Sequence, residues 1–328
     1  MDNKESVIVF GHDTTWHDGN VSIYTPSKRE IVSLASERVD RIKHGGNSKV
    51  VYEYLRKRFS AYKFRTKSDY FTDISKGLKK EGHHLNHAAS TFFGSPFERV
   101  AILVIDGQGP DFGKLASTTI WKGEGNKLEL VEAPYLAAGK FAPKSVGHFY
   151  SAISALSGML NLNEEGKTMG LAAYGKESEI LDYMRKFAYS NTDGTYFIDP
   201  NFIYAVFGNT YGPRSYGWKK QPKKIQKIWK DIIKVRGRPL RSAGEDVTEE
   251  DMNFAFAGQT ILEEIVLGLA KRAKNLTGLE NLCLAGGVAL NAIPNGKIKE
   301  SKIFKDIFIF PASGDDGQSI GKLFYHLH

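Results

Sequence analysis

The stretch HHLNHAAS, residues 83–90, is the segment around which this chain is organised. His83 and His87 are four residues apart. A helix through residues 86–93 would place both imidazoles on one face, one turn apart, where they can share a cation. The alternative is a histidine-rich helix start whose side chains bond to water or backbone. The neighbouring sequence favours a site, because several apolar runs typical of buried strands end in turns that carry glycine and aspartate. These turns lie at residues 11–19, 105–109, 286–288 and 314–317.

The length and composition predict a two-domain globular protein. The chain has 328 residues, and its hydrophobic content of 41% excludes wholesale disorder. The single cysteine, Cys283, lies in an apolar run, which excludes a disulfide framework and favours a reducing compartment. The apolar run near the start is too short for a signal peptide, and no run approaches the ~18 apolar residues of a membrane span. We therefore expect a cytoplasmic protein without a membrane partner.

The net charge of +8 is concentrated in one segment. Residues 219–241 hold ten Lys or Arg and one Asp, whereas the rest of the chain holds 35 basic and 36 acidic residues. Such a segment is usually a packed helix with a solvated outer face. Its charge density, with Trp218 and Trp229 interleaved, also suits contact with a nucleic-acid backbone.

The apolar runs predict a repeated unit of strand, turn, hairpin and helix. The first unit has strands at 7–10, 20–24 and 30–37 and a helix at 48–62; the second has strands at 100–105, 118–121 and 128–131. The match of first strands and their turns predicts a duplicated domain. Further helices are expected at 147–160, 224–234 and 251–275, strands at 281–285 and 307–310, and a final helix ending at 327.

Two glycine-bearing turns are candidates for binding chemistry. The run from Gly286 to Asn291 follows a strand and opens a helix, which suits a nucleotide phosphate or ribose; close packing of helix on strand is the alternative. The turn at residues 314–317 holds two adjacent carboxylates, whose repulsion a cation or solvent must relieve. His83, His87 and Asp315 would form a ligand set for iron(II), zinc or a similar divalent ion, and Asp106 could reach the same ion.

Three weaker signals have structural alternatives. His12, followed by Asp13, could serve in acid–base chemistry, or the pair could form a turn whose aspartate caps the backbone. Lys43 and Lys167 each lie beside a glycine and are candidate phosphate or carbonyl contacts, although a solvated lysine is the more frequent case.

Five motifs in fixed order carry a family resemblance: HHLNHAAS, VIDGQG, EGKTMGLAAYG, LAGGVALN and SGDDGQSIG. Together they resemble the carbamoyltransferase family of nodulation and antibiotic-tailoring enzymes (NodU/CmcH type), from Gly11 to about Gly321. The family's catalytic domain is similar to the universal tRNA threonylcarbamoyl-transfer protein. The resemblance therefore implies an α/β, duplicated actin-like (ribonuclease-H-type) ATPase fold, with two lobes around a nucleotide and metal cleft. It places the first lobe in residues 1–95 and the second in 96–328, with a basic helical insertion near 218–241.

The resemblance also implies roles for individual residues. A divalent metal, iron(II) in the family, would be bound by His83, His87, Asp106 and Asp315. His12 would stand at the acceptor hydroxyl, and His12 and Asp106 are the candidate catalytic residues. The residues implied for the nucleotide are Lys43, Gly166, Lys167, Gly286, Gly287 and Asn291. Those expected to bind the acceptor or a nucleic acid are Arg214, Lys219, Lys220, Lys223 and Lys224.

The implied reaction is attack of an acceptor hydroxyl on a carbamoyl-adenylate that is made from carbamoyl phosphate and ATP. The metal would polarise the carbamoyl group, His12 would take the proton, and AMP would leave. Family members usually continue with a YrdC-like domain that makes the adenylate, and this domain is expected to be absent here. A separate protein would then supply the adenylate, or this chain would activate the carbamoyl group itself.

The sequence leaves several alternatives for the acceptor of the carbamoyl group. The basic segment favours a hydroxymethylated pyrimidine in DNA, and a sugar or antibiotic hydroxyl is the competing acceptor. A regulatory ATP-binding module without catalysis is a third alternative, which the retained His12, His83, His87, Asp106 and Asp315 disfavour.

Overall fold

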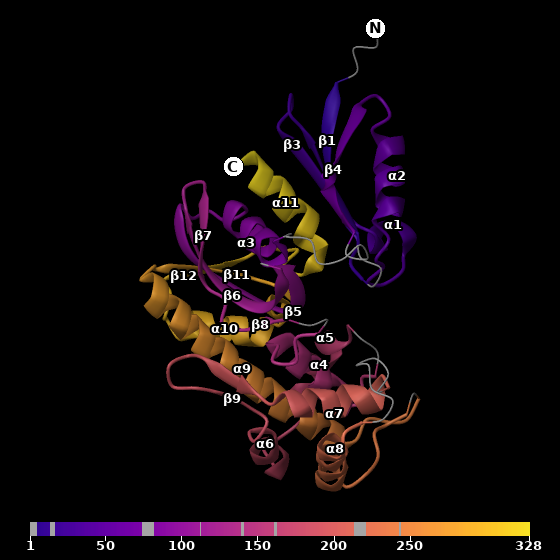
Figure 1. Ribbon diagram of the computed structural model, residues 1–328, viewed down its shortest axis with the longest axis vertical. Helices are drawn as coiled ribbons and strands as arrows, with labels where there is room; N and C mark the ends of the chain where they lie inside the picture. Colours follow the sequence, from indigo (N-terminus) through magenta and orange to yellow (C-terminus); the bar gives the residue numbers. More distant parts are fainter. Residues whose placement is uncertain are drawn as a thin grey trace. The chain divides into compact units, whose positions relative to one another are not determined.

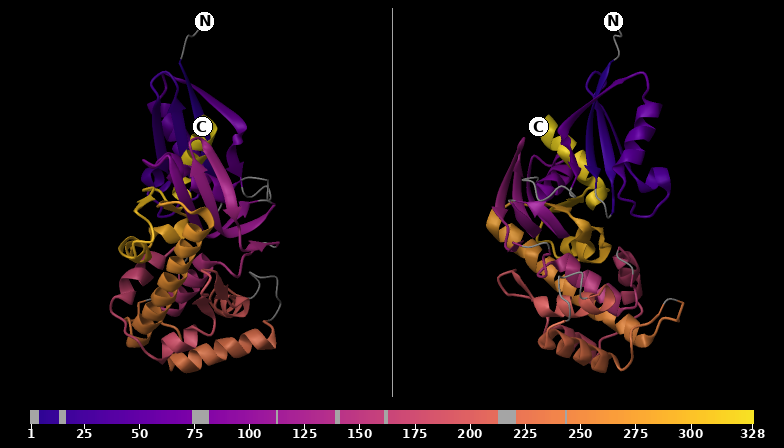
Figure 2. Two further views of the ribbon diagram at one scale, coloured as in Figure 1. Left: turned by 90° about the vertical axis from the view of Figure 1, so that its left-hand side faces the viewer. Right: turned by 45° about the vertical axis from the view of Figure 1, so that its right-hand side comes forward.

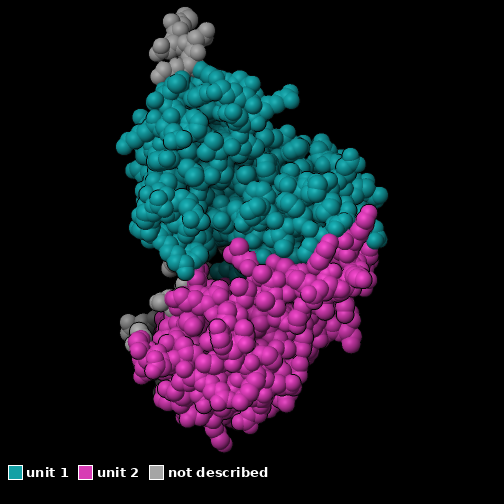
Figure 3. Space-filling model, turned by 180° about the vertical axis from the view of Figure 1, so that it is seen from behind, with its two compact units in different colours: residues 1–133, 279–289, 306–328 teal, residues 134–278, 290–305 magenta. Residues whose placement is uncertain are grey.

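The computed structural model describes residues 5–13, 17–73, 82–111, 113–138, 141–160, 163–212, 221–242 and 244–328. The chain forms two compact units, coloured separately in Figure 3. Unit 1 comprises residues 1–133, 279–289 and 306–328, and unit 2 comprises residues 134–278 and 290–305. The predicted boundary at residue 95 falls inside unit 1, and the assignment of one lobe to each side of it stays a prediction.

The first sheet of unit 1 has the strand order β3-β2-β1-β4. Its first three strands are antiparallel, and β4 runs parallel to β1. Val9 and Ile23, opposite one another on β1 and β2, are buried in a cluster with Val51 and Leu55 of helix α2. The three predicted strands are confirmed, whereas β4 was not predicted. The strands are β1 (Ser6–Asp13), β2 (Asn20–Thr25), β3 (Glu30–Ala35) and β4 (Lys63–Asp73), and the helices α1 (Glu37–Asp40) and α2 (Ser48–Arg58).

The second sheet of unit 1 follows the order β12-β11-β5-β6-β7. Strands β5, β6 and β7 are antiparallel, while β11 and β12 run parallel to β5. Both sheets thus place three antiparallel strands beside parallel ones, in the same order along the chain. This repetition confirms the predicted duplicated α/β fold, and both of its sheets are mixed. The strands are β5 (Arg99–Asp111), β6 (Lys114–Glu124), β7 (Lys127–Glu132), β11 (Asn281–Ala285) and β12 (Asp306–Ile309).

Two helices of unit 1, α3 (His83–Phe93) and α11 (Gln318–Leu327), pack against each other and against different sheets (Figures 1 and 2). Helix α3 contacts β5, β6 and β11, and α11 contacts β1 and β2. Their close approach depends on small residues. A Cβ at Gly321 would lie 2.1 Å from the carbonyl oxygen of Asn86, and Ala88 and Ala89 are fully buried. The 3₁₀ turns η3 (Gly287–Leu290) and η4 (Asp315–Gly317) follow β11 and β12.

The N-terminus of α3 is capped from a distant part of the chain. Its N-cap residue, Gly82, has no side chain to accept a backbone hydrogen bond. Asp111, at the end of β5, supplies the acceptor, because its Oδ2 lies 2.6 Å from the backbone nitrogen of His84. Burial raises the pKa of Asp111 to about 6 despite this hydrogen bond. The second sheet therefore fixes the start of the helix that carries both candidate metal-binding histidines.

Unit 2 is built around α9 (Glu249–Thr277), which packs against α4, α5, α6 and α10. Thr248 and Asp251 form a reciprocal capping box at its start. The predicted helices at 224–234 and 251–275 are confirmed as α8 and α9.

No helix in the described ranges is both long enough and apolar enough to cross a bilayer. The other helices are α4 (Val146–Leu156), α5 (Glu165–Ala172), α6 (Glu179–Met184), α7 (Pro200–Thr210), α8 (Lys223–Arg236) and α10 (Ala292–Glu300), and the strands β8 (Leu136–Ala137), β9 (Ala188–Ser190) and β10 (Tyr196–Ile198).

Replacing Asp111 with asparagine should change how stability depends on pH. The folded protein holds the Asp111 proton to about pH 6, whereas the unfolded chain releases it near the ordinary pKa of 3.8. Asp111 therefore lowers the free energy of unfolding progressively as pH rises from about 4 to 6, by on the order of 2 kcal/mol, with no further loss above. In urea titrations across this window, the stability of wild type relative to Asp111→Asn should fall and then level off.

The asparagine introduced by Asp111→Asn retains an oxygen that can accept the His84 hydrogen bond, so the variant tests the charge and not the cap. Asp246, an exposed aspartate, gives the matched control Asp246→Asn. The stability of wild type relative to this control should not change with pH across the same window. Parallel pH curves for wild type and Asp111→Asn would contradict the assignment.

Candidate metal centre

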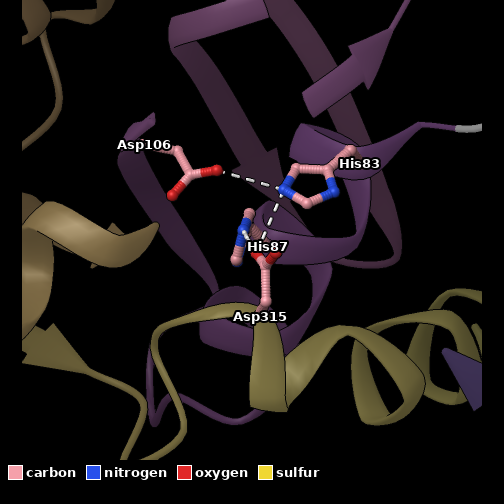
Figure 4. A group of neighbouring side chains, drawn as sticks. All are labelled: His83, His87, Asp106 and Asp315. Carbon is pink, nitrogen blue, oxygen red and sulfur yellow. Dashed lines mark hydrogen bonds and ion pairs between the residues drawn. The ribbon is translucent and has the colours of Figure 1, made fainter. Parts of the chain in front are cut away.

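Four side chains of unit 1 converge at one point, as Figure 4 shows. His83, His87, Asp106 and Asp315 each offer one ligand atom, and these atoms all lie within 4.8 Å of one another. The histidines come from α3, Asp106 from β5 and Asp315 from η4. The structure thus brings together the four residues that the sequence singled out as metal ligands.

Within the described part of the chain, one hydrogen bond joins this cluster, between His83 Nε2 and Asp106 Oδ2, and it leaves other polar atoms of the cluster without a partner. His83 Nε2 lies 3.1 Å from Asp106 Oδ2 and 3.2 Å from Asp315 Oδ1, and His87 Nε2 lies 3.2 Å from the same Asp315 oxygen. Among the described residues, however, neither ring nitrogen of His87 nor Asp315 Oδ1 has a partner in hydrogen-bond geometry. Buried polar atoms left in this state are costly, and a shared divalent ion would satisfy them. The residues present therefore fit a metal.

The electrostatics of the cluster agree with a cation site. Burial and the neighbouring Asp315 both raise the pKa of Asp106, but His83 and His87 outweigh them, so that its pKa is lowered. Burial lowers the pKa of His83, and the two carboxylates raise it well above the ordinary value. A proton on His83 thus balances the carboxylates when no metal is bound. A divalent ion and this proton compete for the same nitrogen.

Backbone contacts hold both carboxylates in place. The backbone nitrogen of Gly287 donates to Asp106 Oδ1 at 2.9 Å. Asn20 of β2 donates from Nδ2 to the carbonyl oxygen of Asp315 at 2.8 Å and accepts from the backbone nitrogen of Ser319 at 2.8 Å. The first sheet therefore positions the turn that carries Asp315.

The glycine pair predicted to contact a nucleotide has a clear packing role. Gly286 has a φ of +89°, and a Cβ there would lie 2.3 Å from the carbonyl oxygen of Ile105. Gly287 directs its backbone nitrogen at Asp106. Close packing of the turn on β5 thus accounts for Gly286, and a nucleotide contact at either glycine stays a prediction.

His12, the predicted proton acceptor, lies at the end of β1 and is only 2% exposed. Its ring centroid is 6.1 Å from that of His83, and neither of its nitrogens has a hydrogen-bond partner among the described residues. Burial lowers the pKa of His12 well below the ordinary value, which leaves the ring neutral at pH 7. A neutral imidazole with free nitrogens is able to accept a proton.

A further cluster next to the site was not predicted. His17 Nδ1 lies 3.0 Å from Asp18 Oδ2 and 3.9 Å from Asp315 Oδ2, and His44 Nδ1 lies 3.0 Å from Asp18 Oδ1. Burial lowers the pKa of His17, but Asp18 and Asp315 outweigh this and raise it to about 9. His17 is thus a cation at neutral pH. Lys43, which was predicted instead of its neighbour His44, is exposed.

The remaining nucleotide candidates lie in unit 2. Gly166 and Lys167 are exposed on α5, and the Lys167 ammonium pairs with Glu164. Asn291 caps α10 and donates from Nδ2 to Gln259 Oε1 at 2.9 Å.

The structure describes two of the five residues that were predicted to bind the acceptor. Lys223 and Lys224 are exposed in the first turn of α8, while Arg214, Lys219 and Lys220 lie outside the described residues.

Comparison with known proteins identifies relatives. The chain is 35% identical to an uncharacterized protein of Synechocystis sp., sll1178, and 32% identical to nodulation protein NolNO of Sinorhizobium fredii. Each match covers 73% of this chain, and 35% and 30% of those proteins respectively. The chain thus spans about a third of the length of the curated relatives it matches. Among solved structures, full-length HypF in a phosphate- and nucleotide-bound form aligns with a TM-score of 0.46 at 16% identity, covering 99% of this chain and 56% of that one.

The profile of a protein family described as "Carbamoyltransferase N-terminus" matches residues 48–323, which include α3, β5, α5, β11 and η4. All four ligand residues of the candidate metal centre lie within this match. The chain therefore belongs to the carbamoyltransferase family.

Proposed function

We propose that this protein is an O-carbamoyltransferase that moves a carbamoyl group from carbamoyl-adenylate to an acceptor hydroxyl. One observation carries the proposal: a carbamoyltransferase-family chain gathers two imidazoles and two carboxylates at one point, and all but the partly exposed Asp315 are buried. The charges of this cluster need a cation or a proton to balance them, which costs stability. Binding of ATP alone would not require such a cluster, which disfavours a non-catalytic ATP-binding module.

The metal centre would hold a divalent ion, and iron(II) is the ion that the family resemblance implies. His83 and His87 would bind through nitrogen, and Asp106 and Asp315 through oxygen, a mixed donor set that suits such an ion. When bound, the ion would supply a Lewis acid for the carbamoyl oxygen. The contacts of Asp106 to Gly287 and of the Asp315 backbone to Asn20 would keep the carboxylates in place as substrates exchange.

In the proposed transfer, the acceptor oxygen forms a bond to the carbamoyl carbon. The bond from that carbon to the bridging phosphate oxygen breaks, and AMP leaves with the electron pair. His12 takes the hydroxyl proton, a role supported by its place beside His83 and by its two ring nitrogens without described partners. Its lowered pKa keeps the ring neutral at pH 7 but makes it a weaker base than an ordinary histidine. His17, which is protonated at neutral pH, cannot accept this proton but places positive charge beside Asp315.

ATP and carbamoyl phosphate are the proposed sources of the adenylate, and a separate protein is a candidate for forming it. The proposed nucleotide contacts are Lys43, Gly166, Lys167, Gly286, Gly287 and Asn291. Gly166 supports this assignment, because a Cβ there would meet no atom within 4 Å. Packing thus gives no reason for a glycine in the first turn of α5, and the same holds for Gly170 in that helix.

The proposed acceptor is a hydroxymethylated pyrimidine in DNA, and a sugar or antibiotic hydroxyl is the alternative. The concentration of basic residues in 219–241 favours the DNA acceptor. Lys223 and Lys224 are the described members of the predicted contact set, and both are exposed.

Removing both histidines should abolish binding of one divalent ion per chain. Titration calorimetry with Fe²⁺ under anaerobic conditions, and with Zn²⁺, should show one site in wild type and none in His83→Ala/His87→Ala, because half of the ligand atoms are lost. The matched control is His326→Ala/His328→Ala, which removes two exposed histidines at the end of α11 and should keep the site. Equal metal content in the double variant and wild type would refute the metal centre, provided that circular dichroism shows both are folded.

Carbamoyl transfer should be visible by mass spectrometry as the gain of CONH₂ in place of a hydroxyl hydrogen. The protein, ATP, carbamoyl phosphate and each acceptor are incubated with and without a carbamoyl-adenylate-forming enzyme, and the acceptors are hydroxymethylcytosine DNA and free sugars. His12→Gln should lower the rate by roughly 10²- to 10⁴-fold while metal binding persists. Undiminished transfer by His83→Ala/His87→Ala would instead favour a metal-independent reaction.

A further inference from the structure

Helix α8 carries a straight row of lysines on its outer face. Lys223, Lys227, Lys230 and Lys234 follow one another at spacings of four, three and four residues, which places them along one side of a helix. All four are exposed, whereas Ile225, Ile232 and Arg236 on the opposite side are buried. We call these four residues the lysine row. Packing requires only the opposite side of α8 and therefore does not explain the row.

Both ends of α8 are fixed within unit 2. At the C-terminal end, the buried Arg236 donates to the carbonyl oxygen of Leu156 at 2.6 Å and pairs with Asp251 in the capping box of α9. At the N-terminal end, Asn209 of α7 donates from Nδ2 to Gln221 Oε1 at 3.2 Å, and α7 packs along the helix. The lysine row is thus presented on a rigid support, which lowers the entropy lost when a partner binds.

The lysine row forms no ion pair with a described residue, although Asp231 of the same helix lies four residues after Lys227 and three before Lys234 and offsets part of their charge. In the described part of the chain, none of its four ammonium groups forms an ion pair or a hydrogen bond. Other lysines of the same unit are neutralised: Lys176 pairs with Glu249, and Lys297 with Glu263. Like charges three and four residues apart destabilise a helix. A ligand that carries several regularly spaced negative charges would relieve this repulsion.

The surface around the row favours a polyanion over a protein or a membrane. Within residues 221–242, no large hydrophobic side chain among those described is exposed, and protein interfaces usually have an apolar centre. A helix that lies in a membrane surface inserts its apolar side, but Ile225 and Ile232 are buried in the protein. The row from Lys223 to Lys234 is roughly 16 Å long at 1.5 Å per residue. Each strand of a duplex carries one phosphate per roughly 3.4 Å of helix axis, so a row of this length corresponds to about five phosphates of one strand measured along the axis.

We propose that the lysine row of α8 is a docking surface for the phosphate backbone of a nucleic acid. The row would hold the polymer, and the hydroxyl that receives the carbamoyl group would be carried by that polymer. This second statement rests on the proposed transfer activity, whereas binding by the row is independent of it.

Salt-dependent binding tests this proposal with the full 328-residue chain. Fluorescence anisotropy with a labelled DNA duplex should show log affinity falling linearly with log salt between about 50 and 200 mM. Lys227→Ala/Lys230→Ala should lower the magnitude of this slope by about 2 and weaken binding by on the order of tenfold per lysine at about 0.1 M salt. Lys57→Ala/Lys271→Ala removes the same charge from exposed positions on α2 and α9 and should keep the wild-type slope.

Three outcomes would overturn the docking surface: an affinity that does not respond to salt, equal slopes for the row variant and its control, or tighter binding to phosphatidylserine vesicles than to the duplex. A separate assay follows carbamoyl transfer to a free hydroxymethyl nucleoside. Loss of duplex binding with transfer intact would refute the docking surface alone. Duplex binding in a protein that transfers to no acceptor would refute the proposed function and leave the docking surface standing.

Discussion

The central constraint of this structure is the burial of two carboxylates beside two imidazoles. Asp106 and Asp315 repel each other, and His83 and His87, together with His17 beside Asp315, offset this repulsion. Their ligand atoms can lie within 4.8 Å only if α3, the middle of β5 and the turn after β12 meet at one place; β5 runs on past the turn expected at residues 105–109 and ends at Asp111. The duplicated fold achieves this, because α3 packs on the second sheet while α11, which follows the Asp315 turn, packs on α3 and on the first sheet.

The supporting contacts show how the fold limits the freedom of this centre. Asp111 fixes the start of α3, Gly287 holds Asp106, and Asn20 bonds to both the Asp315 backbone and the first turn of α11. Each contact joins segments that are distant in the sequence. Preorganised ligands lose little entropy when an ion binds, so the loss of one such contact is expected to weaken metal binding by roughly 10- to 100-fold.

The sequence predicted the parts of this structure whose signals are local. Apolar runs identified the core strands, and the spacing of His83 and His87 placed both on one helix face. Strand β4 was not predicted, because it is rich in charged residues such as Lys63 and Arg65 and lacks an apolar run. An edge strand tolerates such residues. The His44–Asp18 pair was not predicted for another reason. Its partners are 26 residues apart, and only the folded loops bring them together, with the Gly19 backbone nitrogen donating to the carbonyl oxygen of Gly45 at 2.9 Å.

The two helices that matter most for function are constrained in opposite ways. In α3, nine of the eleven residues are buried, so a substitution there disturbs packing and the metal ligands together. In α8, the packing residues occupy one side and the lysine row the other, so the exposed side can change without cost to the core. The positions of the metal ligands on α3 are therefore fixed by packing. The exposed side chains of α8 can change to suit a binding partner without disturbing the core. Because the rest of the chain is nearly neutral, the positive field of the protein is centred on the segment that contains this row, and there it would attract a polyanion first.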